Sequence, residues 1–172
     1  QPIRTLREEP TVPRALSDND VGRLLEELPE HAHVVATVAL DTGMRRSELF
    51  DLQWKDVDFD RQMITVTHSK NGSFRVIPMT QRVFETLRQQ RQQGVIPYVL
   101  PSKAQGGRGQ DIRKALEGAG RRAGIGHITT HQLRHTFATR LRDKGVPLDR
   151  IKELLGHKTM VMTLRYAKAN PV

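Results

Sequence analysis

The chain has 172 residues and a net charge of +9, with 28 Lys and Arg against 19 Asp and Glu. This length allows one domain with a substantial hydrophobic core, and no apolar run approaches the roughly 20 residues that span a bilayer, so we expect no membrane segment. The sequence has no cysteine, which excludes disulfide bonds and thiolate metal sites and is compatible with a reducing cytoplasm, where we expect the protein to act.

The positive charge is distributed unevenly along the chain. Residues 1–60 carry 7 Lys and Arg against 13 Asp and Glu, a net −6, whereas residues 61–172 carry 21 against 6, a net +15. A basic surface of this kind attracts polyanions such as nucleic acid. A solvated basic surface that only aids solubility fits the charge equally well, so charge alone leaves both interpretations open.

Residues 1–14 contain two prolines and no apolar periodicity, which predicts a linker into the domain. Because the chain begins with Gln1 and not with Met, we expect it to be a piece of a longer protein. The domain itself is expected to cover residues 15–172.

Apolar residues at helical spacing, together with start and stop signals, predict three helices in the first third of the domain. Ser17 is a suitable N-cap for the first of them, and Gly43 is a suitable stop for the second. The predicted helices cover residues 17–28, 33–41 and 45–52.

The hydrophobic period changes to that of strands after Val57. Residues 63–67 and 74–77 are rich in β-branched and aromatic side chains, and they flank Asn71-Gly72, the strongest short hairpin signal. These segments predict a small antiparallel sheet. Residues 98–100 predict a further short strand ahead of the glycine-rich residues 105–109.

Helical patterns dominate the remainder of the chain, so the fold class is predicted as α+β, mainly helical with a small antiparallel sheet. The expected helices cover residues 81–93, 110–123, 130–143, 148–155 and 159–169.

The first candidate functional segment is Thr-Gly-Met-Arg-Arg-Ser-Glu-Leu at residues 42–49, where Arg45 begins a helix. An arginine is a permanently charged planar fork suited to phosphate, and a helix start favours an anion. Glu48 lies one turn away and could orient the arginine. An Arg–Glu pair on a helix surface, worth a few tenths of a kcal/mol, is the structural alternative.

Lys70 lies at the tip of the predicted hairpin. An ammonium group at this place could reach a bound ligand, and lysine can donate a proton when its pKa is depressed. A hairpin-tip lysine that only improves solubility is the alternative.

His131 and Arg134 are three residues apart in Thr-His-Gln-Leu-Arg-His-Thr-Phe, so they share one face of a predicted helix near its start. This arrangement suits an anion. His131 and His135 also have the spacing of the zinc-protease helix, but Gln132 stands where that mechanism needs a glutamate base.

The last candidate segment is Leu-Leu-Gly-His-Lys-Thr, which carries His157 and leads to Thr-Leu-Arg-Tyr, which ends at Tyr166. A glycine turn between two short helices is typical of a helix-turn-helix. Taken alone, His157 fits a helix cap and Tyr166 a packing residue.

Taken together, these segments resemble the tyrosine recombinase (phage integrase) family, catalytic domain, and the resemblance covers residues 15–169. The matching boxes are Thr42–Leu49, Lys70, His131–Thr136, Leu155–His157 and Thr163–Tyr166. Five boxes in the family's order are far more specific than any one of them. Gln132 stands where the family often has an acidic residue, and Thr130 where proline is common, but neither difference removes a reacting group.

The resemblance implies a site-specific DNA recombinase in which Tyr166 attacks a DNA phosphodiester. The products are a 3′-phosphotyrosine and a free 5′-hydroxyl, and the reverse attack reseals the strand. Lys70 is then the general acid for the leaving 5′-oxygen, and His131 either assists proton removal from Tyr166 or orients it.

The same resemblance implies that Arg45, Arg134 and His157 are cations that grip the non-bridging phosphate oxygens in the transition state. With these charges in place, neither a metal ion, nor ATP, nor any other cofactor is expected. The implied fold is shared with type IB topoisomerases, and the resemblance also implies a separate N-terminal DNA-binding domain upstream of the linker at residues 1–14.

The implied partners are double-stranded DNA and further copies of the chain, which in this family form a tetramer on DNA. Two alternatives remain open at this point: strand relaxation of the type IB topoisomerase kind, and a non-catalytic helix-turn-helix DNA-binding module in which Tyr166 only packs.

Overall fold

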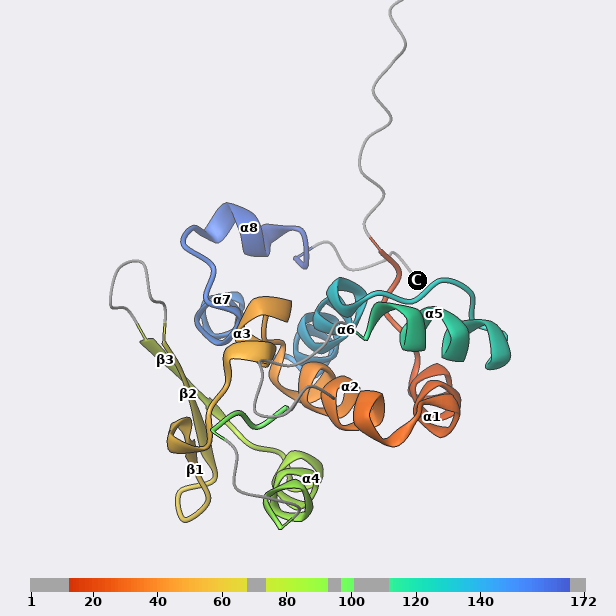
Figure 1. Ribbon diagram of the computed structural model, residues 1–172. Coiled ribbons are helices and arrows are strands. Elements are labelled where there is room, and N and C mark those ends of the chain that lie inside the picture. Colours follow the sequence, from red (N-terminus) through yellow and green to blue (C-terminus); the bar gives the residue numbers. More distant parts are fainter. Residues whose placement is uncertain (1–12, 68–73, 93–96, 101–111, 168–172) are drawn as a thin grey trace, which may run out of the picture.

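The computed structural model describes residues 13–67, 74–92, 97–100 and 112–167 (Figure 1). Within them it confirms a mainly helical α+β domain with a small antiparallel sheet. The helices are α1 (Asp18–Glu27), α2 (Glu30–Thr42), α3 (Arg46–Asp51), α4 (Gln81–Arg91), α5 (Arg113–Arg122), α6 (Thr130–Asp143), α7 (Leu148–Leu155) and α8 (Met160–Leu164), and a single 3-10 turn, η1, lies at Trp54–Asp56. The strands are β1 (Val57–Asp58), β2 (Met63–Thr67) and β3 (Phe74–Pro78).

The sheet has the order β1-β2-β3 with antiparallel pairing throughout. Ile64 lies opposite Ile77, and both side chains are buried, so the predicted pairing of residues 63–67 with 74–77 is confirmed. The predicted Asn71-Gly72 turn lies outside the described residues. The two-residue strand β1 was not predicted from the sequence, because it has too few residues to show a period of two.

The strand predicted at residues 98–100 is wrong. Tyr98 forms only one isolated antiparallel bridge, with Gln53. Val99 and Leu100 are nevertheless buried. The short apolar run therefore correctly indicated a buried segment, but a buried apolar segment need not be a strand.

The predicted helices differ from the observed ones mainly at their ends. Ser17 caps α1 as predicted, since its Oγ accepts a hydrogen bond from the Asp20 N–H at 3.1 Å. Helix α2 begins at Glu30, directly after Pro29, rather than at residue 33. Helix α8 ends at Leu164 rather than at residue 169. No described helix combines the length and the apolar character that crossing a membrane requires.

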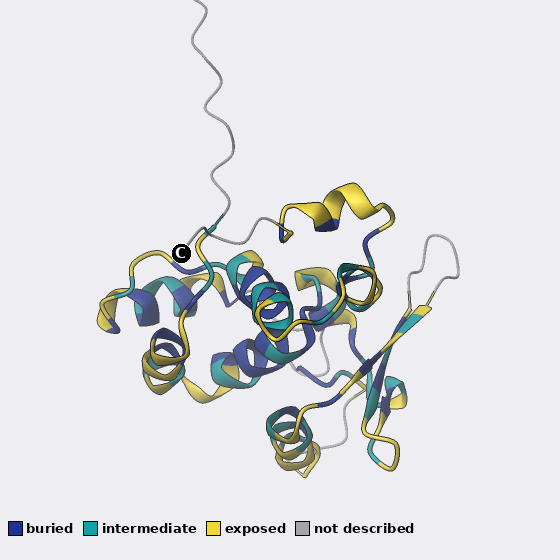
Figure 2. Ribbon diagram, turned by 180° about the vertical axis from the view of Figure 1, so that it is seen from behind, coloured by how far each residue is buried: buried dark blue, intermediate teal, exposed yellow. Residues whose placement is uncertain are grey.

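Helices α2 and α6 pack against each other at the centre of the domain, with α1 and α5 on one side and the sheet on the other (Figure 1). Their facing surfaces are buried, whereas α8 is largely exposed (Figure 2). Most buried apolar residues form one large core. A second, smaller core lies where α6 and α7 meet, and it consists of Phe137, Ala138, Ile151, Leu155 and Tyr166.

Candidate active site

The site begins at the end of α2, where the predicted stop at Gly43 is confirmed. Gly43 has φ +62°, a left-handed conformation that favours glycine. A Cβ at this position would clash with the ring of Phe137 on α6. The glycine therefore allows α2 and α6 to approach closely and brings Arg45, two residues later, beside α6.

Arg45 is anchored at the start of α3 by Glu48. The Arg45 backbone N–H donates to Glu48 Oε2 at 2.8 Å, and Arg45 Nη1 donates to Oε1 at 3.0 Å. The Glu48 side chain is only 8% exposed, so this is not the surface ion pair of the structural alternative. Burial alone would raise the pKa of Glu48, but hydrogen bonds and charge from Arg75 and Arg45 hold the pKa at about 2.

Arg134 is buried on α6 and reaches across to two other segments. Its Nη1 donates to the Gly43 carbonyl at 2.5 Å, and its Nη2 donates to the Leu155 carbonyl at 2.8 Å. Burial and the nearby charge of Arg45 lower the pKa of Arg134 to about 10. The guanidinium is therefore still charged at neutral pH, and Arg45 is a second cation close to it.

His131 lies one turn before Arg134, in the first turn of α6, and is exposed. Thr129 caps this helix, since its Oγ1 accepts from the Gln132 N–H at 3.1 Å. Desolvation by the surrounding protein and the charges of Arg165 and Arg134 lower the pKa of His131 below its ordinary value. His131 is thus neutral at pH 7 and able to accept a proton.

The zinc alternative gains no support from the geometry. His135, one turn after His131, is buried with its ring centroid 5.2 Å from that of Tyr166. Across the part of the chain that the structure describes, no group of three His, Cys, Asp or Glu side chains is placed to hold a metal ion.

His157 follows the left-handed Gly156 that ends α7, and it is buried. Its Nδ1 lies 2.8 Å from the hydroxyl oxygen of Thr163. Burial and the charges of Arg134, Arg165, Arg45 and Arg75 lower the pKa of His157 to about 4. In the free protein its imidazole is therefore neutral and can offer one N–H to an anion, and the expected cationic role of His157 on bound phosphate stays a prediction.

A cavity of about 470 Å³ brings together four of the six predicted residues. Arg45, His131, Arg134 and His157 all line it, although they come from three separate segments of the chain. Lys70 lies outside the described residues.

Three further arginines line the same cavity, Arg46, Arg113 and Arg165. Sequence reasoning gave the catalytic role to Arg45 rather than to its neighbour Arg46, and it missed Arg113 and Arg165. Arg165 directly precedes Tyr166, the predicted nucleophile. Arg113 lies in α5, where no sequence motif indicated a functional residue. The cavity wall is consequently more basic than the predicted residues alone would make it.

Tyr166 does not line this cavity. Its side chain is 1% exposed and belongs to the second core. Its ring stacks on His157, with a centroid distance of 6.4 Å and 9° between the planes, and Arg165 lies over it at 5.5 Å. The sequence predicted Tyr166 late in a helix over residues 159–169. Because α8 ends at Leu164, Tyr166 lies instead in the turn after that helix.

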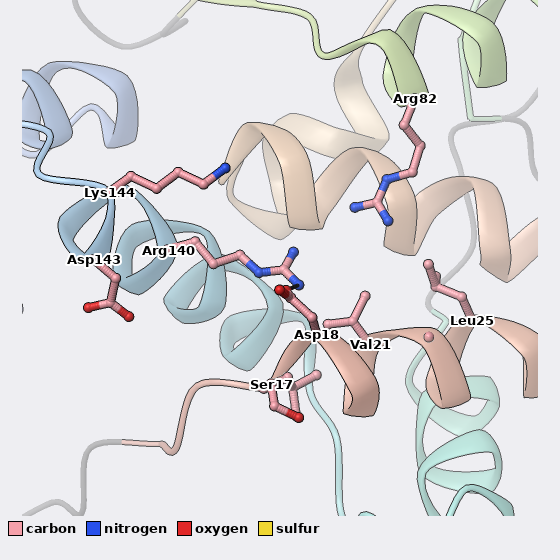
Figure 3. Close-up of a pocket in the computed structure, with 10 residues that line it drawn as sticks. Ser17, Asp18, Val21, Leu25, Arg82, Arg140, Asp143 and Lys144 are labelled. Carbon is pink, nitrogen blue, oxygen red and sulfur yellow. Dashed lines mark hydrogen bonds and ion pairs between the residues drawn. The ribbon is translucent and has the colours of Figure 1, made fainter.

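A larger pocket of about 630 Å³ lies between α1 and the end of α6 (Figure 3). Its charges largely compensate one another. The guanidinium of Arg140 meets the Asp18 carboxylate, as Figure 3 shows, and Arg82 pairs with Asp41. None of the predicted residues within the described part of the chain lines it, so the smaller cavity is the candidate site.

Comparison with known proteins gives one consistent result. A family model described as the phage integrase family matches residues 14–171. Tyrosine recombinase XerA of Pyrococcus furiosus is 30% identical over 167 residues, which are 92% of this chain and 58% of that protein. This chain thus spans about three fifths of the length of that relative.

Two solved structures extend the likeness to three dimensions. A crystal structure of XerA recombinase superimposes with a TM-score of 0.81 at 28% identity, covering 96% of this chain and 63% of the other. The catalytic domain of bacteriophage HP1 integrase gives a TM-score of 0.69 at 31% identity, covering 89% of this chain and 86% of that domain.

Proposed function

This chain belongs to the phage integrase family, and from that membership we propose that it is the catalytic part of a site-specific DNA recombinase. In this proposal the enzyme breaks and rejoins DNA strands through a 3′-phosphotyrosine at Tyr166. The single observation that carries the proposal is the cavity in which Arg45, His131, Arg134 and His157 meet. These four residues match the family's boxes position by position.

The chemistry of the cavity suits a phosphodiester. Attack on phosphorus increases the negative charge on the non-bridging oxygens, and two fixed guanidinium groups can bind these oxygens without rearrangement. Arg45 and Arg134 are held by hydrogen bonds to Glu48 and to backbone carbonyls. His157 adds a neutral donor if the Thr163 hydroxyl donates to its Nδ1, because Nε2 then carries the hydrogen.

The reaction in this proposal replaces one phosphate ester with another. The phenolic oxygen of Tyr166 forms a bond to phosphorus, and the bond from phosphorus to the 5′-oxygen breaks. The proton of the phenol passes to His131, whose lowered pKa leaves it neutral and ready to accept. Lys70 donates a proton to the leaving 5′-oxygen. Because bond energy is conserved in the ester, ATP is not required.

Tyr166 must move for this reaction to occur. Its ring is buried and stacks on His157, which lines the cavity while Tyr166 does not. The turn that holds Tyr166 follows α8, a helix of five residues with exposed Met160, Val161, Met162 and Leu164. So short and exposed a helix has few buried contacts to hold it, which supports a shift of this segment when DNA binds.

The proposal extends to the whole protein. Residues 1–14 connect to an upstream DNA-binding domain, as the greater length of the Pyrococcus furiosus relative supports. The substrate is double-stranded DNA, and four copies assemble on two duplexes in the cytoplasm. The exposed apolar side chains of α8 support contacts between copies, since such a patch is costly to leave in water.

The test is to trap and map the covalent intermediate. The protein is incubated with a nicked suicide duplex that carries the target site, and the protein–DNA adduct is digested and mapped by peptide mass. We expect the adduct at Tyr166. Relaxation of a supercoiled plasmid without strand-exchange products would favour the topoisomerase alternative. DNA binding without any covalent adduct would favour the helix-turn-helix module.

The matched variants are Tyr166→Phe and Tyr98→Phe, which change the only two tyrosines of the chain. Tyr166→Phe should abolish the adduct while DNA binding persists, because the arginines that bind phosphate remain. Tyr98→Phe should form the adduct normally. An adduct at normal yield from Tyr166→Phe would overturn the proposal.

A further inference from the structure

The C-terminal end of α7 is bound by three arginines from three different elements. The last carbonyls of a helix lack partners within the helix and carry its negative dipole end, so cations and donors stabilise them. Here each of three consecutive carbonyls accepts a hydrogen bond of 2.8 Å from a different arginine. The pairs are Leu154 with Arg75 Nε, Leu155 with Arg134 Nη2, and Gly156 with Arg45 Nη2.

Two of these arginines, Arg45 and Arg134, line the cavity, but Arg75 does not. Arg75 lies on β3 and points to the same face of the strand as the buried Ile77, two residues further on. Its side chain is 9% exposed. Arg75 therefore reaches α7 from the side of the sheet, behind the wall of the cavity.

Arg75 also shares a carboxylate with Arg45. Its Nη1 donates to Glu48 Oε1 at 2.8 Å and its Nη2 to Oε2 at 2.7 Å, a two-bond fork. The same two oxygens accept from Arg45. Glu48 thus links Arg45, which lines the cavity, to Arg75, which does not. The position of the Glu48 carboxylate depends on its hydrogen bonds to both arginines.

The turn that presents His157 depends on the same guanidinium. Gly156 packs so closely on Arg75 that a Cβ there would lie 2.9 Å from Nη1. His157 follows this glycine directly, and its backbone N–H closes the turn on the Lys152 carbonyl at 3.1 Å. Arg75 is therefore in contact with the supports of both Arg45 and His157.

We propose that Arg75 is a positioning residue for the phosphate site: by binding Glu48 and the end of α7, it holds Arg45 and His157 in the geometry that a phosphate needs. This inference rests on the proposed function and assigns a role to a residue outside the family boxes described above. Arg75 touches no substrate in this scheme. Its planar fork does what a lysine cannot, because the three donors of an ammonium group share one nitrogen and cannot make two parallel bonds to a carboxylate.

The test uses Arg75→Lys in the full-length protein, which keeps the charge and removes the fork. Single-turnover cleavage of the nicked suicide duplex should slow by roughly 10- to 100-fold, less than the 10²- to 10³-fold typical of a donor that contacts the reacting group. DNA affinity should stay within about twofold, because DNA binding sums contacts to many phosphates and the substitution disturbs only the phosphate in the cavity.

The matched control is Arg82→Lys. Arg82 also pairs with a carboxylate, Asp41, which is 11% exposed, but it lies on α4 and does not line the candidate site. Its cleavage rate should equal that of the unmodified protein. If Arg75→Lys cleaves as fast as Arg82→Lys, the positioning role is disproved.

A double-mutant cycle separates positioning from general stability. If Arg75 acts through Arg45, then Arg75→Lys should slow cleavage much less in an Arg45→Ala background than in the unmodified protein. Equal losses in both backgrounds would show that Arg75 does not act through Arg45. If the thermal transition shows that Arg75→Lys does not fold, Glu48→Gln replaces it in the double-mutant cycle, because it weakens the same Arg75–Glu48 ion pair. Glu48→Gln should then slow cleavage much less in the Arg45→Ala background, and equal losses would again count against the proposal.

Inorganic phosphate gives a readout that is independent of cleavage. Its binding can be followed through the imidazole NMR signals of His131 and His157, which both line the cavity. Arg75→Lys should weaken phosphate binding at least about threefold, and Arg82→Lys should not. If the unmodified protein forms no adduct, the proposed function fails while this measurement still tests Arg75. Unchanged phosphate affinity together with an unchanged cleavage rate would overturn the inference alone.

Discussion

The ring of Tyr166 lies almost parallel to the imidazole of His157, with 6.4 Å between the ring centroids. His157 lines the basic cavity and Tyr166 does not, so only the imidazole of these two stacked rings borders the place where the target would bind. The phenol is also enclosed by the second core, which includes Phe137 and Leu155. In the free protein, therefore, the proposed nucleophile is shielded.

This shielding predicts the reactivity of the two tyrosines toward a nitrating reagent such as tetranitromethane. Tyr98 is partly exposed, whereas Tyr166 is 1% exposed. In the free protein we expect Tyr98 to be nitrated and Tyr166 to be protected, as measured by peptide mass spectrometry at partial modification. Equal modification of both tyrosines in the folded protein would show that Tyr166 leaves the second core without DNA.

Gly156→Ala should destabilise the protein by more than a left-handed backbone alone explains. Gly156 has φ +67°, which costs a residue with a side chain roughly 1–2 kcal/mol, and its Cβ would also displace the guanidinium of Arg75. Gly145→Ala is the control, since Gly145 has φ +78° but its Cβ would meet no described atom within 4 Å. Urea unfolding of both variants gives the comparison, and equal losses would contradict the close contact with Arg75.

Acidification from pH 7 should lower the stability of the protein. Burial, with nearby positive groups, holds the pKa of His135 and of His157 at about 4 in the folded protein, while an unfolded histidine titrates near 6.5. Between these values the unfolded chain binds more protons, so stability falls as the pH falls from about 6.5 to about 4. The melting temperature measured across this range should decline by several degrees, because about 1 kcal/mol corresponds to roughly 2–4 °C for a domain of this size.

His135→Phe should make the melting temperature less dependent on pH over the same range. The phenyl ring can keep the contact with Tyr166, and it removes one of the groups that protonate on unfolding. A pH dependence as steep as that of the unmodified protein would show that His135 is not protected from protonation in the fold.

Strand cleavage should not require a divalent metal ion. The charge that builds up on the phosphate is met by Arg45 and Arg134, which are permanent cations at neutral pH. The rate of adduct formation on the suicide duplex should be unchanged by excess EDTA. Activity that disappears with the chelator and returns with Mg²⁺ or Zn²⁺ would refute this mechanism.

The sequence predicted those parts of the site whose signals are local. Arg45 beside a glycine stop and His131 with Arg134 on one helix face were recognisable, and the order of the boxes predicted that distant segments belong together. The hairpin strands 63–67 and 74–77 followed from their period and from the turn between them. Each of these signals lies within a few residues of chain.

The remaining features depend on contacts between segments far apart in the sequence. Arg75 sits in a strand whose inward face is otherwise apolar, and only its distance to Glu48, 27 residues earlier, reveals its role. The burial of Tyr166 depends on α6 and α7 together. The neutral state of His157 depends on its burial and on the arginines around it. An arginine at an inward strand position was the one signal that could have been noticed, because the period of two places Arg75 on the face of Ile77.

The crowding of cations around Arg134 makes the empty protein less stable than it would be with an anion bound. Burial lowers the pKa of Arg134 most, and the charge of Arg45 lowers it further. The contribution of Arg45 reflects repulsion between two cations, which a bound anion relieves. Any ligand that binds only the folded state raises the melting temperature, by an amount equivalent to about 2.7 kcal/mol at a concentration 100 times its Kd. The rise in melting temperature on adding phosphate or sulfate is thus a simple assay for ligands of the cavity. It needs no DNA.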